Sequence, residues 1–298
     1  MPGAAEIVPR GPFSLRAAAE FGFGQNAGQP PTYDGAMRLA FPVDGGQGHA
    51  GVVLRQPRPN DPMTVELELT GGADPQRALA QAARVVSLDH DGEQFLEVGA
   101  RDPVIGRLQR AHPGQRPVLF HSPYEGAAWS IISARRPAAQ AARVRAELSE
   151  RLGASFELAG QHLYSFPQPD RLVELGDEAP GLTADKVDRL RGLAEVALAG
   201  ELDVNHLHAI GPDQAYEDLQ RIKGIGPFYA GLIVLRASGF ADAMLAVPEQ
   251  RGLRHTARFY GLEAPPTLDQ LAALAEPWRP LRTWAIVLIR LAGDRGTE

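Results

Sequence analysis

The stretch that decides the fold is Leu219-Gln-Arg-Ile-Lys-Gly-Ile-Gly-Pro-Phe-Tyr-Ala-Gly-Leu-Ile-Val234. Apolar residues with helical spacing stand at both of its ends, and Gly224 and Gly226 interrupt that spacing in the middle. Because glycine tolerates positive φ, the chain can turn sharply there while Ile225 points back between the two helices. The second helix is expected to begin at Pro227, where the missing N–H group costs nothing. The pattern predicts two helices joined by a tight turn.

The turn itself predicts an anion site. The amides of Gly224, Ile225 and Gly226 and the free N–H groups of the second helix face outward together, and Lys223 stands beside them. Such an arrangement suits a phosphate of a nucleic-acid backbone. A glycine-rich link that touches no ligand is the alternative, but the apolar spacing on both sides favours the stretch as a DNA contact. It resembles the helix-hairpin-helix motif of DNA-binding proteins.

Composition narrows the class of protein. The 298 residues allow two domains or one large one, and 44% hydrophobic residues suffice for a sizeable core. No run approaches a membrane helix and no signal peptide begins the chain, so a cytoplasmic location is expected. The absence of cysteine excludes disulfides and thiolate metal sites, and no other metal site is expected.

Charge is distributed unevenly along the chain. A net charge of −6 argues against a protein that coats nucleic acid. Residues 129–145 nevertheless carry four arginines and no acid, and residues 251–258 carry three arginines, including Arg251 and Arg254, and a histidine. Local patches of this kind can serve an enzyme that reads a site on DNA.

The chain divides by periodicity into two regions. Residues 1–105 are expected to form a small antiparallel sheet with helices, since residues 63–70 alternate apolar and polar side chains with a period of two. Residues 106–298 are expected to be all-helical, with the hairpin near 219–234 and a long helix from Glu125 to Gly153 that Pro137 bends. The fold class is therefore α+β.

The order of these features is similar to one known family. A small sheet domain precedes a helical region with one late hairpin, followed by Val247-Pro-Glu-Gln250 and by residues 278–285. The chain resembles the helix-hairpin-helix DNA glycosylases, nearest the bacterial 3-methyladenine DNA glycosylase II type. The resemblance implies two helical subdomains with a cleft for a flipped base, and a monomer that excises alkylated or damaged purines from duplex DNA in base-excision repair.

The resemblance leaves the catalytic carboxylate open between two positions. In the family an aspartate just after the hairpin's second helix stabilises the positive charge that develops on the sugar. One alignment places Gln250 at that position, and another places Glu249 there. Glutamine cannot supply the charge, whereas glutamate can if its longer side chain reaches. A solvated loop acid is the alternative for Glu249.

Three aromatic residues are candidates for the base pocket. Phe228 stands where bifunctional members carry the lysine that forms a Schiff base, which implies a monofunctional enzyme. Phe228 and Trp278 match positions where the alkylpurine branch stacks positively charged bases, and we assign Tyr124, near the start of the long helix, to the same pocket. Core packing is the commoner explanation for each aromatic alone.

Two further features follow from the resemblance. Arg135 falls where the family inserts a side chain into the gap left by the flipped base; a solvated arginine is the alternative. Family members bind a monovalent cation through hairpin carbonyls, and the sequence leaves such a cation open while implying no other cofactor.

Two other functions compete with an excising enzyme. One is a lesion-binding protein that kept the fold and lost catalysis, which the uncertain carboxylate motivates. The other is a general helix-hairpin-helix module of the sort found in polymerases and ligases, and the matching regions outside the hairpin argue against it.

Overall fold

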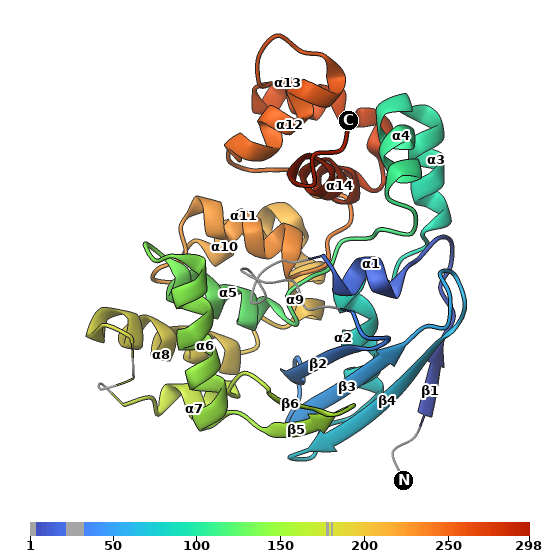
Figure 1. The fold of residues 1–298 in the computed structure, drawn as a ribbon. Coiled ribbons are helices and arrows are strands. Elements are labelled where there is room, and N and C mark those ends of the chain that lie inside the picture. Colours follow the sequence, from blue (N-terminus) through green and yellow to red (C-terminus); the bar gives the residue numbers. More distant parts are fainter. Residues whose placement is uncertain (1–3, 22–32, 177–178, 180) are drawn as a thin grey trace.

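The N-terminal region is built on an antiparallel sheet. The computed structural model describes residues 4–21, 33–176, 179 and 181–298. Four strands lie in the order β1-β4-β3-β2 (Figure 1). Their bounds are β1 Ala4–Ile7, β2 Met37–Pro42, β3 His49–Arg55 and β4 Met63–Thr70. All neighbours pair antiparallel, as Val52 of β3 does with Leu67 of β4, so the predicted sheet is confirmed.

The alternation in β4 places its apolar side chains on the covered face. Met63 and Val65 are fully buried, whereas Thr64 and Glu66 face solvent. Helix α2 (Pro75–Val85) contacts β4, and its Ala78 side chain is buried in the same core. A half-polar strand therefore forms because one face is dry and the other is wet.

The remainder of the chain is mostly helical. The helices outside α2 are α1 (Leu15–Ala19), α3 (Glu93–Arg101), α4 (Pro103–Ala111), α5 (Pro123–Ser133), α6 (Ala138–Leu152), α7 (Pro169–Val173), α8 (Ala184–Leu198), α9 (Val204–Ile210), α10 (Pro212–Leu219), α11 (Pro227–Arg236), α12 (Gln250–Tyr260), α13 (Leu268–Leu274), the 3-10 turn η2 (Glu276–Trp278) and α14 (Arg282–Asp294). The fold is α+β, as predicted.

The single long helix expected from Glu125 to Gly153 is two helices. Helix α5 ends at Ser133 and α6 begins after Pro137. Arg135 between them has φ of +55°, in the left-handed region that ends a helix. Proline removes a helical N–H group and clashes with the preceding turn, so the chain breaks here and does not merely bend.

A two-stranded hairpin interrupts the region that was expected to be all-helical. Strands β5 (Ser155–Leu158) and β6 (Gln161–Tyr164) pair antiparallel, and β5 packs against β3. The contact is close: a Cβ added to Gly51 would lie 2.6 Å from the Phe156 ring. The four residues of each strand are too few for a period-two pattern to stand out, which is why the sequence did not reveal them.

Four buried clusters of described residues hold the fold together. One lies beneath the sheet, the second joins α5, α6 and α8 to the α10–α11 hairpin, and the third joins α3 and α4 to α12 and α14. The fourth and smallest joins β2 and β3 to β5. Packing therefore groups residues 93–111 with the C-terminal helices, so the domain boundary proposed at 105 runs through a packed unit. No helix among the described residues combines the length and apolarity needed to cross a membrane.

Candidate active site

The turn of the hairpin has the geometry that its two glycines predict. Gly224 has φ of +101°, whereas Gly226 is extended, with φ of −94° and ψ of 178°. Ile225 between them is 3% exposed and joins the core of the second cluster, while Lys223 is exposed. Only Gly224 therefore needs glycine for its backbone conformation. A Cβ at Gly226 would meet no atom within 4 Å, so that position is open to a ligand.

The N-terminus of α11 is free to bind an anion. Gly226 is its N-cap and supplies no side-chain hydrogen bond, and Pro227 follows as the first helical residue. The first N–H groups of a helix lack partners within the helix. Together with the helix dipole such groups favour an anion, for example a phosphate, and the exposed Lys223 precedes the N-cap by three residues.

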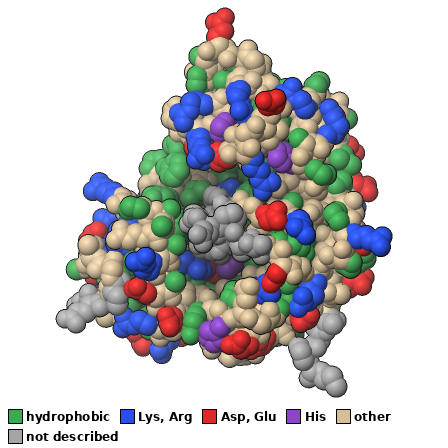
Figure 2. Space-filling model, viewed as in Figure 1, with side chains coloured by type: hydrophobic (Ala, Val, Ile, Leu, Met, Phe, Trp, Pro, Cys, Tyr) green, Lys and Arg blue, Asp and Glu red, His purple; other side chains and the backbone are tan. Residues whose placement is uncertain are grey.

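A cavity of about 630 Å3 lies between α11 and the two helices α12 and α14. Its walls are mostly aliphatic, and the side chains at its polar end come from α12, α14 and the loop before α12. The end of α1 closes another side through Glu20 and Phe21. In the space-filling view, basic side chains gather over the lobe that carries α12 to α14, and in these helices they are arginines (Figure 2). The cavity thus lies between two helical subdomains, where the resemblance predicts a base pocket.

Of the two candidate carboxylate positions, only Glu249 lines this cavity. Its carboxylate caps α12, accepting hydrogen bonds from the Arg251 amide at 3.2 Å and the Gly252 amide at 2.6 Å. Gln250 is the first residue of α12, is exposed and lies outside the cavity lining. The helix dipole and the capping bonds both favour a negatively charged group at residue 249.

A network of charged side chains surrounds Glu249, and two of its members, Arg290 and Asp294, were not among the predicted residues. Arg290 of α14 donates from Nε to Glu249 Oε2 at 3.3 Å and is also paired with Asp294. Asp294 in turn pairs with Arg251 at 2.8 Å and with His255 at 3.0 Å. The available signal was an arginine and an aspartate four residues apart on an otherwise apolar helix, a spacing that places both on one face.

A buried arginine forms another part of the cavity wall. Arg236, at the end of α11, donates to the Val118 carbonyl at 2.7 Å, and its guanidinium lies 4.9 Å from the centre of the Phe21 ring. Burial, with a smaller contribution from the charge of Arg290, lowers the pKa of Arg236 to about 9. The cavity is therefore bounded by cationic side chains as well as by the Glu249 carboxylate.

The three aromatic candidates occupy different places. Phe228 lines the cavity and is 51% exposed, so about half of the residue is accessible. Trp278 is fully buried, with its indole N–H donating to Asp102 at 2.8 Å and to Tyr260 at 3.2 Å. Tyr124 is 5% exposed and donates to the Pro167 carbonyl at 3.2 Å.

Two of the three aromatic residues assigned to the base pocket, Trp278 and Tyr124, therefore lie elsewhere. Trp278 and Tyr124 pack in cores, because each finds a polar partner for its N–H or O–H group there. Neither lines the cavity; of the aromatic residues that the structure describes, Phe228 and Phe21 line it, and no sequence pattern marked Phe21.

The remaining arginine candidates lie on the surface. Arg135 is exposed at the α5–α6 turn, Arg254 is exposed on α12, and Arg251 reaches the cavity rim while pairing with Asp294. These positions flank the hairpin and the cavity but do not converge on one point.

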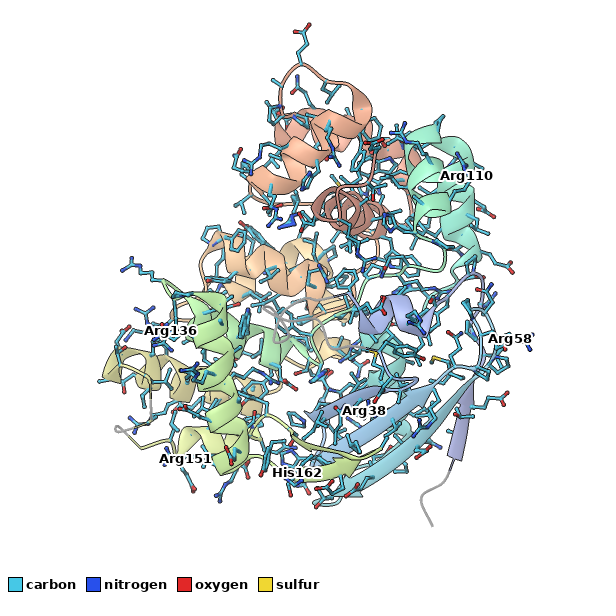
Figure 3. The ribbon with its side chains drawn as sticks, in the orientation of Figure 1. Arg38, Arg58, Arg110, Arg136, Arg151 and His162 are labelled. Carbon is cyan, nitrogen blue, oxygen red and sulfur yellow. The ribbon has the colours of Figure 1, made fainter. Side chains whose placement is uncertain are left out.

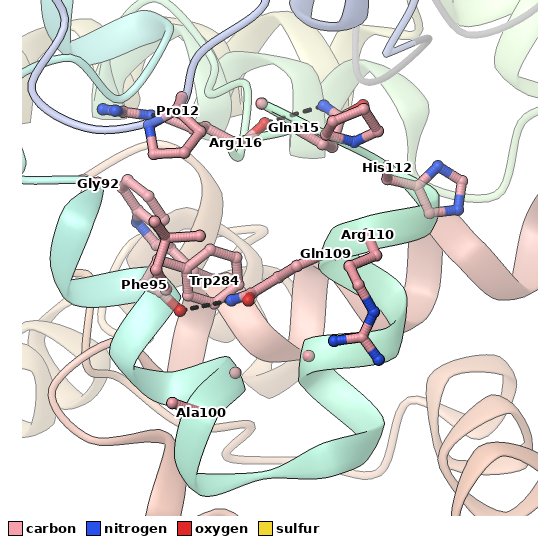
Figure 4. Close-up of a pocket in the computed structure, with 15 residues that line it drawn as sticks. Pro12, Gly92, Phe95, Ala100, Gln109, Arg110, His112, Gln115, Arg116 and Trp284 are labelled. Atoms are coloured by element: carbon pink, nitrogen blue, oxygen red, sulfur yellow. Dashed lines mark hydrogen bonds between the residues drawn. The ribbon is translucent and has the colours of Figure 1, made fainter.

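A second cavity, of about 580 Å3, lies on α3 and α4 and contains none of the predicted residues. Figure 4 shows Phe95 and Trp284 on its wall, with Gln115 donating to the carbonyl of Arg116 above them. It lacks a carboxylate among its lining residues, so it offers no group for the chemistry that the first cavity can support.

The geometry can be compared with known proteins. No family model matches the chain. A protein of Bacillus subtilis named DNA-3-methyladenine glycosylase is 25% identical over 202 residues, 66% of each chain. A protein of Mycobacterium tuberculosis named probable bifunctional transcriptional activator/DNA repair enzyme AlkA is 29% identical over 259 residues, 85% of this chain and 49% of that one. The chain thus spans from half to two thirds of these relatives.

The chain resembles DNA glycosylases in both sequence and fold. The solved 3-methyladenine DNA glycosylase of Archaeoglobus fulgidus superposes with a TM-score of 0.77 at 20% identity, over 97% of this chain and 98% of that one. The 8-oxoguanine glycosylase/lyase of Clostridium acetobutylicum, solved with double-stranded DNA, gives a TM-score of 0.66 at 16% identity over 100% and 99%. The glycosylase fold that the hairpin and its surroundings predict is confirmed.

Proposed function

We propose that this protein is a monofunctional DNA glycosylase that acts as a monomer and excises alkylated or otherwise damaged purines from duplex DNA in base-excision repair. The observation that carries the proposal is the cavity that Glu249 and Phe228 both line, because Phe228 lies on the second helix of the hairpin, two residues after its N-cap Gly226. The name of the Bacillus subtilis relative, DNA-3-methyladenine glycosylase, supports this reaction and this kind of base, and the name of the Mycobacterium tuberculosis relative supports a role in DNA repair.

The reaction follows from where the carboxylate lies. A base extruded from the duplex enters the cavity, and its sugar stays at the mouth near Glu249. As the bond between the sugar C1′ and the base nitrogen breaks, its electron pair leaves with the base and positive charge builds on the sugar. The fixed carboxylate stabilises that charge, and a water oxygen then bonds to C1′ and loses a proton. The implied hairpin cation plays no part in these steps.

The kind of base follows from the exposed ring. The open face of Phe228 can stack on an electron-poor purine. A base that already carries a positive charge is a good leaving group, so one carboxylate and one aromatic face suffice for its release. Trp278 is left out of this proposal because its indole has no exposed face.

Absence of strand cleavage follows from the lysine content. The sequence contains two lysines, Lys186 and Lys223, and neither lines the cavity. A Schiff base with the sugar needs an amine within reach of C1′. Phe228 stands where bifunctional members carry that lysine, so we expect an intact strand after base release.

The DNA is held on the face that carries the hairpin. Lys223 and the amides at Gly224, Ile225 and Gly226 would hold one phosphate, and Arg251 and Arg254 of α12 the backbone beyond it. Arg135 would enter the gap left by the extruded base. Phosphate contacts of this kind do not depend on sequence, which suits an enzyme that searches for damage.

The test is release of free base from duplex DNA treated with a methylating agent. We expect free methylpurines to appear with strands that stay intact until alkali cleaves the abasic sites. Strand cleavage without alkali would contradict the monofunctional assignment. Tight binding to the methylated duplex with no release would favour the second candidate, a lesion-binding protein, for which the engagement of Glu249 by its cap and by Arg290 is the supporting observation.

A further inference from the structure

The turn between α5 and α6 holds an arginine in an unusual backbone conformation. Arg135 has φ of +55° although it is neither glycine nor asparagine, and its side chain is exposed. A non-glycine residue in the left-handed region persists where the surroundings impose that conformation. Contacts on both sides of the turn show what imposes it.

A single lysine from another helix closes the end of α5. Lys186, in the first turn of α8, donates from Nζ to the Ile132 carbonyl at 2.7 Å and to the Ala134 carbonyl at 2.9 Å. The last carbonyls of a helix have no partner within the helix, and a cation there is favoured by the helix dipole. Lys186 therefore holds two of the three carbonyls that precede Arg135.

The other side of the turn is fixed as well. The Arg136 amide donates to the Ser133 carbonyl at 3.0 Å, and its guanidinium donates to the Gly181 carbonyl at 2.6 Å, just before α8. Figure 3 shows Arg136 near the start of α6. Arg135 is thus bracketed by two contacts to the start of α8, with its own side chain left exposed.

The start of α8 also touches the hairpin. A Cβ added to Gly224 would lie 2.9 Å from Cδ of Arg189 and 3.5 Å from Cγ1 of Ile131. Residues of α5, α8 and the hairpin turn therefore meet at one place. A change at the start of α8 can shift the Arg135 turn relative to the phosphate site.

Lys186 lies in an environment that is unfavourable for a positive charge. Burial lowers the pKa of Lys186, and the positive charges of Arg136 and Arg189 lower it further. The hydrogen bonds from Lys186 to the Ile132 and Ala134 carbonyls offset the cost of burying the charge. Only a long side chain reaches both carbonyls from α8.

We propose that Lys186 is a positioning residue, which holds the α5–α6 turn so that Arg135 points into the gap left by an extruded base. The inference rests on the role proposed above for Arg135. It does not require that the protein break a glycosidic bond, because insertion into the duplex is a binding event.

The experiment measures affinity for two duplexes of one sequence, one of which carries a tetrahydrofuran analogue of an abasic site. The variants are Lys186→Met, Lys186→Arg, Arg135→Ala and the double variant Lys186→Met/Arg135→Ala. Arg191→Met is the matched control, because Arg191 also lies on α8 and donates to a carbonyl, that of Leu175, away from the turn. Circular dichroism and melting confirm that each variant is folded.

We expect Lys186→Met to weaken binding to the abasic duplex about tenfold and to change binding to the intact duplex little. A loss of this size is typical of two residues that are energetically coupled. Lys186→Arg should restore binding, since a guanidinium can reach the same carbonyls, and Arg191→Met should match the wild type. In the Arg135→Ala background, Lys186→Met should have no further effect.

Three results would overturn the inference. The first is an equal loss on both duplexes with a shallower salt dependence, which would make Lys186 a phosphate contact. The second is a loss that persists in the Arg135→Ala background. The third is an Arg135→Ala variant that binds the abasic duplex like the wild type. Base release is measured in parallel. If Lys186 and Arg135 are coupled in binding but no free base is released, the enzymatic proposal is refuted and the positioning role of Lys186 stands.

Discussion

The two walls of the cavity are built in different ways. The α11 wall begins at the hairpin, where the turn, the buried Ile225 and the free helix N-terminus all lie within one short stretch of sequence. On the opposite wall, Glu249 meets Arg290, forty-one residues further along the chain, and Asp294 joins them to α12. One wall is local in sequence and the other is assembled by packing.

The difference indicates which wall serves phosphate binding and which serves stabilisation of charge on the sugar. Binding a phosphate needs backbone amides in one conformation, and a local stretch can encode that. Stabilising charge on a sugar needs a carboxylate held at a fixed point in space, and that point depends on how α12 and α14 pack. Substitutions on the two walls should therefore fail in different assays.

The largest effect is expected on the packed wall, at the carboxylate. Glu249→Gln removes the negative charge but keeps the shape of the cap, so fold and DNA affinity should persist. The rate of base release under single-turnover conditions should fall about a hundredfold, or about 3 kcal/mol. Gln250→Ala is the matched control and should release base at the wild-type rate. Unchanged release by Glu249→Gln, with a gain in Gln250→Asp, would move the carboxylate site to residue 250.

The next effect is expected on the local wall, at Gly224. Gly224→Val forces a β-branched residue to φ of +101° and drives its Cβ to 2.9 Å from Arg189. The free energy of unfolding in urea should fall by about 2 kcal/mol, with a lower melting temperature. A variant as stable as the wild type would show that the turn relaxes without cost and that no particular backbone is imposed there.

Gly226 sharpens the contrast within the same turn. Gly226→Val places a side chain in open space at an extended backbone position, so stability should change little. The side chain would stand where a phosphate must approach, and affinity for duplex DNA should fall about tenfold for every sequence. Fluorescence anisotropy with two duplexes of unrelated sequence measures this affinity. An unchanged affinity would remove the hairpin from the DNA interface.

The smallest effect distinguishes Phe228 from Trp278, two of the three aromatic residues expected in the pocket. Trp278→Phe loses the hydrogen bonds to Asp102 and Tyr260, and stability should fall by about 1 kcal/mol with base release unaltered below the melting temperature. Phe228→Leu should slow base release and leave stability nearly unchanged, because the exposed ring contributes little to the core. Slowed release in Trp278→Phe at unchanged stability would return the indole to the pocket.

The sequence by itself determined the features that depend on neighbours along the chain. Alternation in residues 63–70 predicts a half-buried strand because successive side chains point to opposite faces. Two glycines around Ile225 predict the hairpin, because glycine tolerates the positive φ that a sharp turn requires, and Gly224 adopts such a φ. The resemblance to DNA glycosylases rests on these local patterns and on their order.

Tertiary structure alone decided which side chains share the cavity. The choice of Glu249 over Gln250, the burial of Trp278 and Tyr124, and the entry of Phe21 from the N-terminal segment all depend on packing between distant elements. A one-residue change of register around a helix start turns a side chain by about 100°, a rotation that no alignment of a variable loop fixes. Whether an aromatic ring lies in a core or a pocket likewise depends on the neighbouring helix, which the residue's own surroundings in sequence do not specify.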